Sequence, residues 1–134
     1  MTHLPPALGA GRRDPTPTHA EGGGTVPVQR FAAVIRLRPE LEAEYRALHA
    51  AAWPQVLATI KRANIGNYSI FLRDGLLFSY LEYTGEDYAA DTALLAECPV
   101  TRDWWARTDP CQQPLDSVDE GEWWAPAEEV FHLD

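Results

Sequence analysis

A two-residue turn between two alternating segments constrains the fold of this chain more than any other feature. Asp74-Gly75 separates residues 67–73 from residues 76–83, and Asp-Gly is a strong signal for a tight β-hairpin. The apolar side chains of the first segment share one face of an extended chain: Tyr68, Ile70 and Leu72. The two segments are therefore predicted to be adjacent antiparallel strands, preceded by turn chemistry at residues 64–67.

A third strand is predicted at residues 29–37, where apolar residues alternate with arginines. Pro39 ends this strand and suits the first turn of a helix, in which acidic residues favour the helix N-terminus. Apolar residues then recur at helical spacing between residues 41 and 60. Pro54 interrupts this stretch because proline lacks the amide donor, so we predict a break near Trp53 and a second helical piece ending near residue 62.

The remaining segments complete an alternating order of strands and helices. Helices are predicted at residues 86–97 and 99–108, an irregular loop at 109–127 and a closing strand at 128–133. This order, β-α-β-β-α-(α)-β, predicts an α+β, ferredoxin-like antiparallel sheet with helices on one face. Apolar residues on the other face favour a homodimer that packs sheet on sheet, a dimeric α/β-barrel arrangement.

The N-terminal part of the chain differs in composition from the rest. Residues 1–26 are rich in proline and glycine and are predicted to be a disordered leader, whereas residues 27–134 are predicted to form the single domain. His3 and His19 lie in this leader, and we interpret them as parts of a mobile tail rather than metal ligands.

Charge and cysteine content limit the partners and the compartment. The net charge of -9 disfavours binding to nucleic acid and to anionic membranes. No apolar run approaches the length of about 18 residues that a membrane-spanning helix needs. The two cysteines, Cys98 and Cys111, form no CxxC pair, and the N-terminus lacks a signal-peptide pattern. A cytoplasmic protein with reduced thiols is therefore expected, with Cys98 as a small buried residue.

A column of three side chains is the leading candidate for chemistry. Tyr45, His49 and Trp53 stand four residues apart, a spacing that stacks side chains on one helix face. A histidine on a half-apolar helix face is more often structural than catalytic. Histidine is also the commonest general acid or base, and the polar tips beside His49 favour a small-molecule pocket. We therefore consider His49 the candidate acid/base.

Two tryptophan pairs supply further candidates. Adjacent helical residues point about 100° apart, so one member of Trp104-Trp105 is expected in the core and the other in a stacking wall. Indole faces suit the apolar faces of sugar rings, although both rings filling the core is an equally good interpretation. Trp123-Trp124 invites the same interpretation or a dimer contact, and Tyr68 could present its hydroxyl to the same cavity. No catalytic-triad spacing, phosphate loop or dinucleotide fingerprint is present.

At these positions residues 29–134 resemble the L-rhamnose mutarotase family. Four motifs carry the resemblance, and their order and spacing together are rather specific: Glu44-Tyr45-x-x-x-His49-x-x-x-Trp53-Pro54, Asn67-Tyr68-Ser-Ile-Phe-Leu, Val100-Thr-Arg-Asp-Trp104-Trp105 and Glu128-Glu129-Val130-Phe131-His132-Leu133. The resemblance implies a dimeric ferredoxin-like fold. It also implies interconversion of the α and β anomers of L-rhamnose without a cofactor or a metal.

The resemblance also implies roles for individual residues. The histidine that matches His49 is the proton donor of the family, and four aromatic residues contact the sugar: Tyr45, Tyr68, Trp104 and Trp105. The sequence departs from the family in two places. Ala50-Ala51 stands where the family often has Asn-Pro, which leaves the sugar preference open, and the long leader is extra.

Two other functions fit the same residues. One is a non-catalytic sugar-binding or dimerisation module on the same fold, which would bind without accelerating anomer exchange. The other is a haem- or oxygen-handling protein with His49 as an axial ligand, which would show a visible absorption band.

Overall fold

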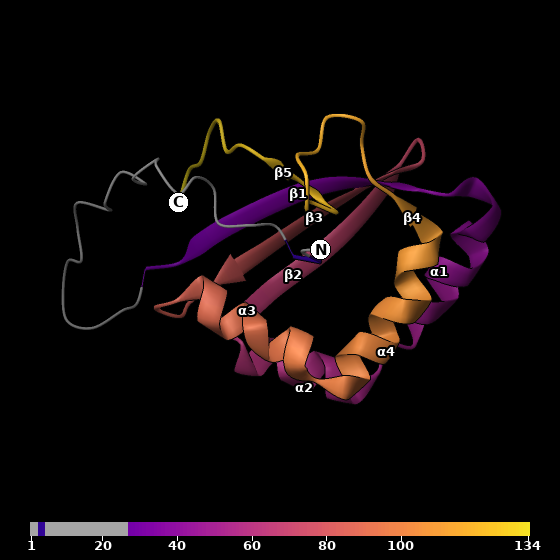
Figure 1. The fold of residues 1–134 in the computed structure, drawn as a ribbon. Coiled ribbons are helices and arrows are strands. Elements are labelled where there is room, and N and C mark those ends of the chain that lie inside the picture. Colours follow the sequence, from indigo (N-terminus) through magenta and orange to yellow (C-terminus); the bar gives the residue numbers. More distant parts are fainter. Residues whose placement is uncertain (1–2, 5–26) are drawn as a thin grey trace.

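A curled antiparallel sheet with helices on one face forms the body of the protein (Figure 1). The computed structural model describes residues 3–4 and 27–134. The elements, in chain order, are β1 (Gln29–Leu37), the short 3₁₀ turn η1 (Pro39–Leu41), α1 (Glu42–Ala50), α2 (Pro54–Arg62), β2 (Ile65–Arg73), β3 (Leu76–Tyr83), α3 (Tyr88–Glu97), α4 (Pro99–Thr108), the 3₁₀ turn η2 (Asp109–Cys111), β4 (Gln112–Gln113) and β5 (Ala125–Ala127).

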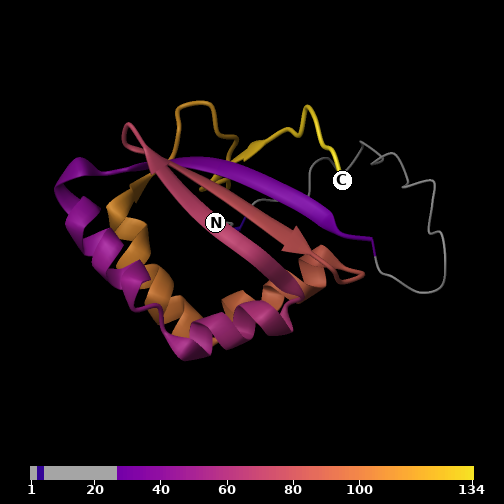
Figure 2. The same ribbon diagram turned by 180° about the vertical axis from the view of Figure 1, so that it is seen from behind.

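The sheet has the strand order β2-β3-β1-β4, and β5 also pairs with β1. β1 runs antiparallel to β3, with Ala33 opposite Ser79. The four α-helices lie on one side of this sheet, as the view from behind also shows (Figure 2). The predicted α+β, ferredoxin-like class is therefore confirmed.

The central hairpin forms where the Asp-Gly turn predicts it. Asp74 and Gly75 have φ values of 52° and 73°, and both positive values are those of a type I′ turn. β2 and β3 then pair in register up to the turn, with Arg73 opposite Leu76. The turn matches the right-handed twist of the strands, so this connection fixes their register.

The apolar face of β1 turns toward the helices and supplies the core. Its four predicted inward residues are buried: Phe31, Ala33, Ile35 and Leu37. Leu77 and Leu81 of β3 are buried on the same face of the sheet. Burying side chains of this size contributes about 1.5–3 kcal/mol for each large aliphatic residue, which makes the β1–β3 pair the centre of the fold.

The helix break at Pro54 is also confirmed. α1 ends at Ala50, and Trp53 has extended backbone angles, φ −69° and ψ 129°, as the residue that precedes α2. Pro54 occupies the first turn of α2, where its missing amide donor costs nothing. Trp53 therefore does not continue the column of α1, and the predicted three-residue column is reduced to Tyr45 and His49.

Two element boundaries differ from the sequence prediction. β2 begins at Ile65, because the expected turn at residues 64–67 is partly a β-bulge between Gly66 and Ser69. Positive φ values at Asn64 (62°) and Asn67 (44°) account for the turn-like composition. α3 begins at Tyr88 rather than residue 86, because the Asp87 side chain caps it by accepting from the amide of Ala90 at 3.1 Å.

The C-terminal prediction is wrong in two respects. Residues 128–133 form no strand, and Val130, Phe131 and Leu133 are 93%, 79% and 80% exposed. The loop predicted at residues 109–127 instead contains β4 and β5, which pair with β1. Alternation of apolar residues was the only signal for a strand at 128–133, and that signal does not reveal whether a neighbouring strand is within reach.

Outside the sheet and helices, two leader residues are described. His3 and Leu4 pack against the domain, while residues 1–2 and 5–26, with His19, lie outside the described residues; the division into a leader and a domain stays a prediction. Both cysteines are free, but Cys111 is the buried one and Cys98 is half-buried, contrary to expectation. Within residues 3–4 and 27–134, no helix is long and apolar enough to cross a bilayer.

Candidate active site

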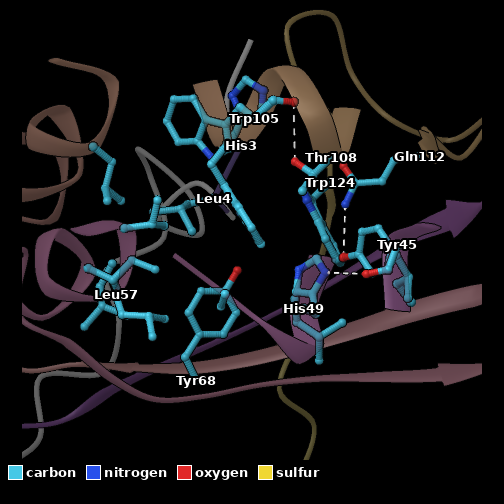
Figure 3. Close-up of a pocket in the computed structure, with 18 of the residues that line it drawn as sticks. His3, Leu4, Tyr45, His49, Leu57, Tyr68, Trp105, Thr108, Gln112 and Trp124 are labelled. Atoms are coloured by element: carbon cyan, nitrogen blue, oxygen red, sulfur yellow. Dashed lines mark hydrogen bonds between the residues drawn. The ribbon is translucent and has the colours of Figure 1, made fainter. Parts of the chain in front are cut away.

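A cavity of about 1080 Å³ lies between the sheet and the helices (Figure 3). Its volume lies just above the range of about 300–1,000 Å³ that is typical of small-molecule sites. Aromatic and aliphatic side chains from α1, α2, β2 and α4 form most of its wall. The five residues predicted from the sequence all line it: Tyr45, His49, Tyr68, Trp104 and Trp105.

α1 places two of these residues one helical turn apart. The ring centroids of Tyr45 and His49 are 4.2 Å apart, which is the contact that their spacing of four residues predicts. The imidazole Nδ1 of His49 lies 3.0 Å from the main-chain carbonyl oxygen of Tyr45. A carbonyl oxygen only accepts, so Nδ1 carries the proton and donates it. The other nitrogen, Nε2, is then left with its lone pair when the ring is neutral.

Burial favours the neutral form of this histidine. Loss of hydration lowers the pKa of His49 from the ordinary value of 6.5, and the hydrogen bond to the Tyr45 carbonyl opposes part of this effect. At neutral pH the ring is therefore mostly an uncharged imidazole. A neutral ring with a fixed tautomer can accept a proton at Nε2 and return it, which is what a general acid/base requires.

A buried amide holds the hydroxyl group of Tyr45. Gln112 of β4 donates from its Nε2 to the Tyr45 hydroxyl oxygen at 3.3 Å, and its Oε1 accepts from the indole nitrogen of Trp123 at 2.8 Å. The indole can only donate, so it fixes which end of the amide faces Tyr45. The phenol O–H is left to donate elsewhere, and burial raises the pKa of Tyr45, so this group stays protonated.

The bulge in β2 brings Tyr68 to the cavity. Tyr68 lies within the bulged stretch between Gly66 and Ser69, where a strand changes the direction of its side chains. Its hydroxyl points into the space beside His49 (Figure 3). Burial raises the pKa of Tyr68 to about 12, so its hydroxyl too remains a neutral donor.

The two adjacent tryptophans of α4 point in different directions, so one is buried and the other is half-buried. Trp104 is 8% exposed, and its ring makes T-shaped contacts with the rings of His49 and Trp53, with centroids 5.2 Å away in each case. Trp105 is half-buried and turns one face toward the leader residue His3. Trp53 does not line the cavity, but its ring contacts that of Trp104.

Sequence reasoning missed several residues of the cavity wall. Gln112 and Asp109 lie in a stretch that was predicted to be loop, and His3 lies in the leader. Trp124 is buried beside the cavity, a core role that its neighbour on the chain, Trp123, only partly shares. The paired tryptophans were the one signal that this acidic stretch packs against the domain.

The described side chains offer general acid/base and hydrogen-bonding groups rather than a ligand set for metal. No group of three or more His, Cys, Asp or Glu side chains within residues 3–4 and 27–134 is arranged to hold a metal ion. An uncharged imidazole, two phenol donors and indole faces in one cavity can exchange protons with a neutral, ring-shaped, hydroxyl-rich ligand.

Fold and site together define an α+β protein with a ferredoxin-like sheet and an aromatic cavity of the size of a small-molecule site. Comparison with known proteins makes this class specific. The family model described as L-rhamnose mutarotase matches residues 30–133. The L-rhamnose mutarotase of Sinorhizobium fredii is 37% identical over 109 residues, which are 79% of this chain and 99% of that protein. The corresponding protein of Acidiphilium cryptum is 36% identical over 114 residues, with the same coverage.

Solved structures agree on the fold. The crystal structure of an L-rhamnose mutarotase from Formosa agariphila matches with a TM-score of 0.61 and 22% identity, over 79% of this chain and 99% of the other. Tetracenomycin F2 cyclase from Streptomyces glaucescens matches with a TM-score of 0.58 and 15% identity, over 79% and 97%. The chain belongs to the L-rhamnose mutarotase family, and it is accordingly an enzyme of the carbohydrate mutarotase class, an isomerase.

Proposed function

We propose that this enzyme interconverts the α and β anomers of L-rhamnose with His49 as its proton-transfer residue. Family membership carries the activity, and the hydrogen bond from Nδ1 of His49 to the Tyr45 carbonyl at 3.0 Å carries the role of the histidine. That bond leaves Nε2 as the nitrogen that takes and returns the proton. Neither the binding-module alternative nor the haem alternative is favoured by this membership.

The reaction needs two proton transfers and a rotation. A base removes the proton of the anomeric hydroxyl while an acid protonates the ring oxygen, and the C1–ring oxygen bond breaks to give the open aldehyde. The aldehyde rotates and the ring closes on its other face. Neutral His49 acts as the base in one direction, and its protonated form acts as the acid in the return step. The O–H of Tyr45, or a water molecule, supplies the second proton, because Gln112 already occupies the phenol oxygen as a donor.

Four aromatic residues are proposed to hold the sugar. Trp104 and Trp105 provide apolar faces for the ring, and Tyr45 and Tyr68 provide hydroxyl donors. The methyl group of a 6-deoxy sugar needs an apolar niche, which the aliphatic residues of β2 in the cavity wall supply: Ile70 and Leu72. No cofactor or metal enters this scheme, because it consists of proton transfers, the cleavage and re-formation of the C1–ring oxygen bond, and a bond rotation.

We also propose that the enzyme is a cytoplasmic homodimer. Phe71 and Phe78 stand opposite each other on neighbouring strands and are 62% and 37% exposed. Phe78 lies between the buried residues Leu77 and Ser79 of β3, so its side chain is on the sheet face away from the helices. A second copy that packs on this face would bury them. The net charge of -9 supports the absence of nucleic-acid and membrane partners.

The deciding experiment is NMR saturation-difference exchange between the anomers of L-rhamnose, near neutral pH, with and without the protein. Acceleration that is lost in His49→Asn establishes both the activity and the acid/base. No acceleration with L-rhamnose, nor with a panel of other 6-deoxy and pentose sugars, would return the non-catalytic binding module to first place.

A further inference from the structure

The cavity already contains a part of this chain. His3 and Leu4 both line it, although more than twenty residues separate them from β1 (Figures 1 and 2). In both views residues 3–4, drawn in indigo, lie within the arch formed by the sheet and the helices. The cavity wall therefore has one contribution that the ferredoxin-like domain does not make.

His3 covers the exposed face of Trp105. The two rings are nearly parallel, with an interplanar angle of 5° and centroids 4.1 Å apart (Figure 3). The other side of this interaction is polar, because Nε2 of His3 lies 2.7 Å from Oδ2 of Asp109. The side chain of His3 is only 12% exposed. A flat ring on an indole face with a hydrogen bond to a carboxylate is also the geometry in which a sugar ring would bind.

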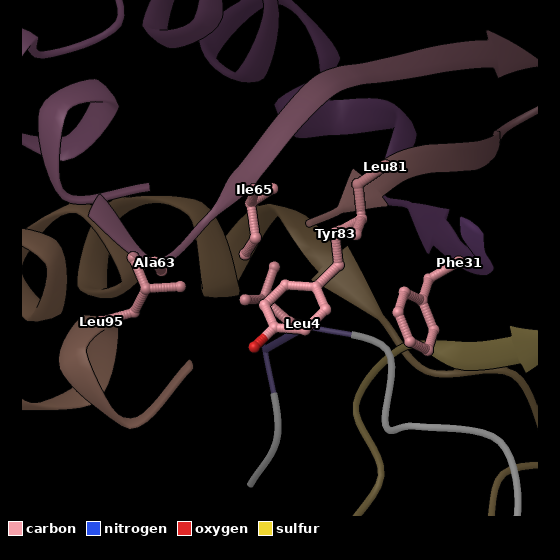
Figure 4. Packing of buried hydrophobic residues seen from close by; sticks show 7 residues of the cluster. All are labelled: Leu4, Phe31, Ala63, Ile65, Leu81, Tyr83 and Leu95. Carbon is pink, nitrogen blue, oxygen red and sulfur yellow. The ribbon is translucent and has the colours of Figure 1, made fainter. Parts of the chain in front are cut away.

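Leu4 anchors this segment in the core. It is 7% exposed and belongs to a buried cluster with Phe31, Ile65 and Leu81 (Figure 4). Removal of this apolar surface from water favours the inserted position of the segment. The segment is therefore held by the apolar contacts of Leu4 and by the stacking and hydrogen bond of His3.

Asp109 has an unused acceptor beside this contact. Its Oδ1 is buried, and no described residue donates to it, whereas Oδ2 pairs with His3. A buried carboxylate oxygen without a donor is unfavourable, so this group gains from any ligand that brings hydroxyl donors. A sugar has several hydroxyl groups, while one His3 nitrogen satisfies only one of the two oxygens.

We propose that His3–Leu4 is an internal competitor of the sugar, and that Asp109 is a substrate-binding residue for which the two compete. The sugar ring takes the Trp105 face and donates hydroxyl hydrogen bonds to Asp109 only after His3 has left both. The inference rests on the proposed function in one respect, the assignment of Trp105 to the sugar site.

Competition of this kind has a defined kinetic signature. The apparent affinity is the intrinsic affinity multiplied by the fraction of molecules with an open site, and minor states are commonly populated at about 0.1–10%. Removal of the competitor should therefore lower KM for L-rhamnose by about tenfold or more. The turnover number kcat should not change, because the sugar-bound state is the same with or without His3.

The first test compares leader variants in the full chain. His3→Ala and the double variant His3→Ala/Leu4→Ala should each lower KM at constant kcat, measured by NMR exchange of the L-rhamnose anomers. His19→Ala, which changes the same residue type elsewhere in the leader, is the matched control and should leave both constants at their wild-type values. An unchanged KM in the double variant overturns the competition.

A second test separates the two roles of Asp109. Asp109→Asn is compared in the wild-type chain and in the His3→Ala/Leu4→Ala background. If Asp109 accepts sugar hydroxyls, the asparagine raises KM in that background by about tenfold, as expected for lost hydrogen bonds to a charged group. No change in that background would show that Asp109 serves only to hold His3, which refutes its assignment to the sugar.

A spectroscopic readout is independent of turnover. The imidazole proton signals of His3 should be shifted upfield by the indole ring current, and Trp105→Ala should abolish the shift. Addition of L-rhamnose should move them to the position found in Trp105→Ala. Displacement of His3 by the sugar without faster anomer exchange refutes the proposed function and supports this inference. Faster anomer exchange without a shift of the His3 signals supports the proposed function and refutes this inference.

Discussion

The two ends of the cavity differ in what holds their side chains in place. At the proton-transfer end, defined by Tyr45, His49 and Gln112, partners within the domain hold the side chains: His49 through the Tyr45 carbonyl, and Gln112 through Trp123. At the stacking end, defined by Trp105, Asp109 and His3, the leader residue His3 is the partner of both Trp105 and Asp109. The Oδ1 atom of Asp109 has no hydrogen-bond partner among the described residues. On the proposals above, the first end is prearranged for proton transfer, whereas the second is occupied by a contact that the sugar has to displace.

The largest effect is expected at the proton-transfer end. His49→Asn should lower the rate of anomer exchange by about 10²–10⁴-fold, the usual contribution of a general acid/base. Asparagine is smaller and cannot exchange protons near neutral pH, while circular dichroism should report an unchanged fold. The measurement is NMR saturation exchange with L-rhamnose, and His132→Asn on the exposed C-terminal segment is the control. Wild-type exchange in His49→Asn would remove His49 from the mechanism.

Gln112→Leu tests whether prearrangement matters. The change leaves the Trp123 indole N–H and the Tyr45 hydroxyl without their amide partner, which should cost about 1–3 kcal/mol of unfolding free energy in urea denaturation. It should also lower kcat by about tenfold, while KM changes little, because the amide orients the Tyr45 hydroxyl. The adjacent, exposed Gln113→Leu is the matched control. Equal kcat in both variants would show that Gln112 is only structural.

At the stacking end, a loss of affinity rather than of turnover is expected. Trp105→Leu in the His3→Ala background, where no competitor is present, should raise KM by about two- to tenfold, the equivalent of about 0.5–1.5 kcal/mol of aromatic contact. The kcat should stay near that of the background. A fall in kcat with constant KM would show that Trp105 contributes to proton transfer rather than to sugar binding, contrary to this prediction.

The smallest effect concerns pH. Burial lowers the pKa of His49, so the folded protein binds fewer protons here than the unfolded chain below the ordinary value of 6.5. This contribution to stability is complete above pH 6.5 and is lost as pH falls toward the lowered pKa. Activity should fall in the same direction, by at most about tenfold per pH unit, with its acid limb below pH 6.5. A limb above 6.5 would contradict the direction of the shift.

The sequence predicted those parts of the site that local geometry determines. Tyr45 and His49 meet because α1 places residues four apart on one face, and Asp74-Gly75 fixes the hairpin. Gln112 could not be predicted, because its partner Tyr45 lies 67 positions away and β4 is only two residues long. His3 was equally inaccessible to prediction, since proline- and glycine-rich composition does not reveal that a single leucine next to it fits the core.

The pairing of β1 has a consequence for how this protein folds during its synthesis. One edge of β1 pairs with β3 at residues 76–83, and the other with β4 and β5, which end at Ala127. The sheet therefore cannot be completed until the chain has been synthesised at least as far as Ala127. Contacts across such distances in sequence close slowly. Until then one edge of β1 is unpaired, and an unpaired strand edge favours association between chains.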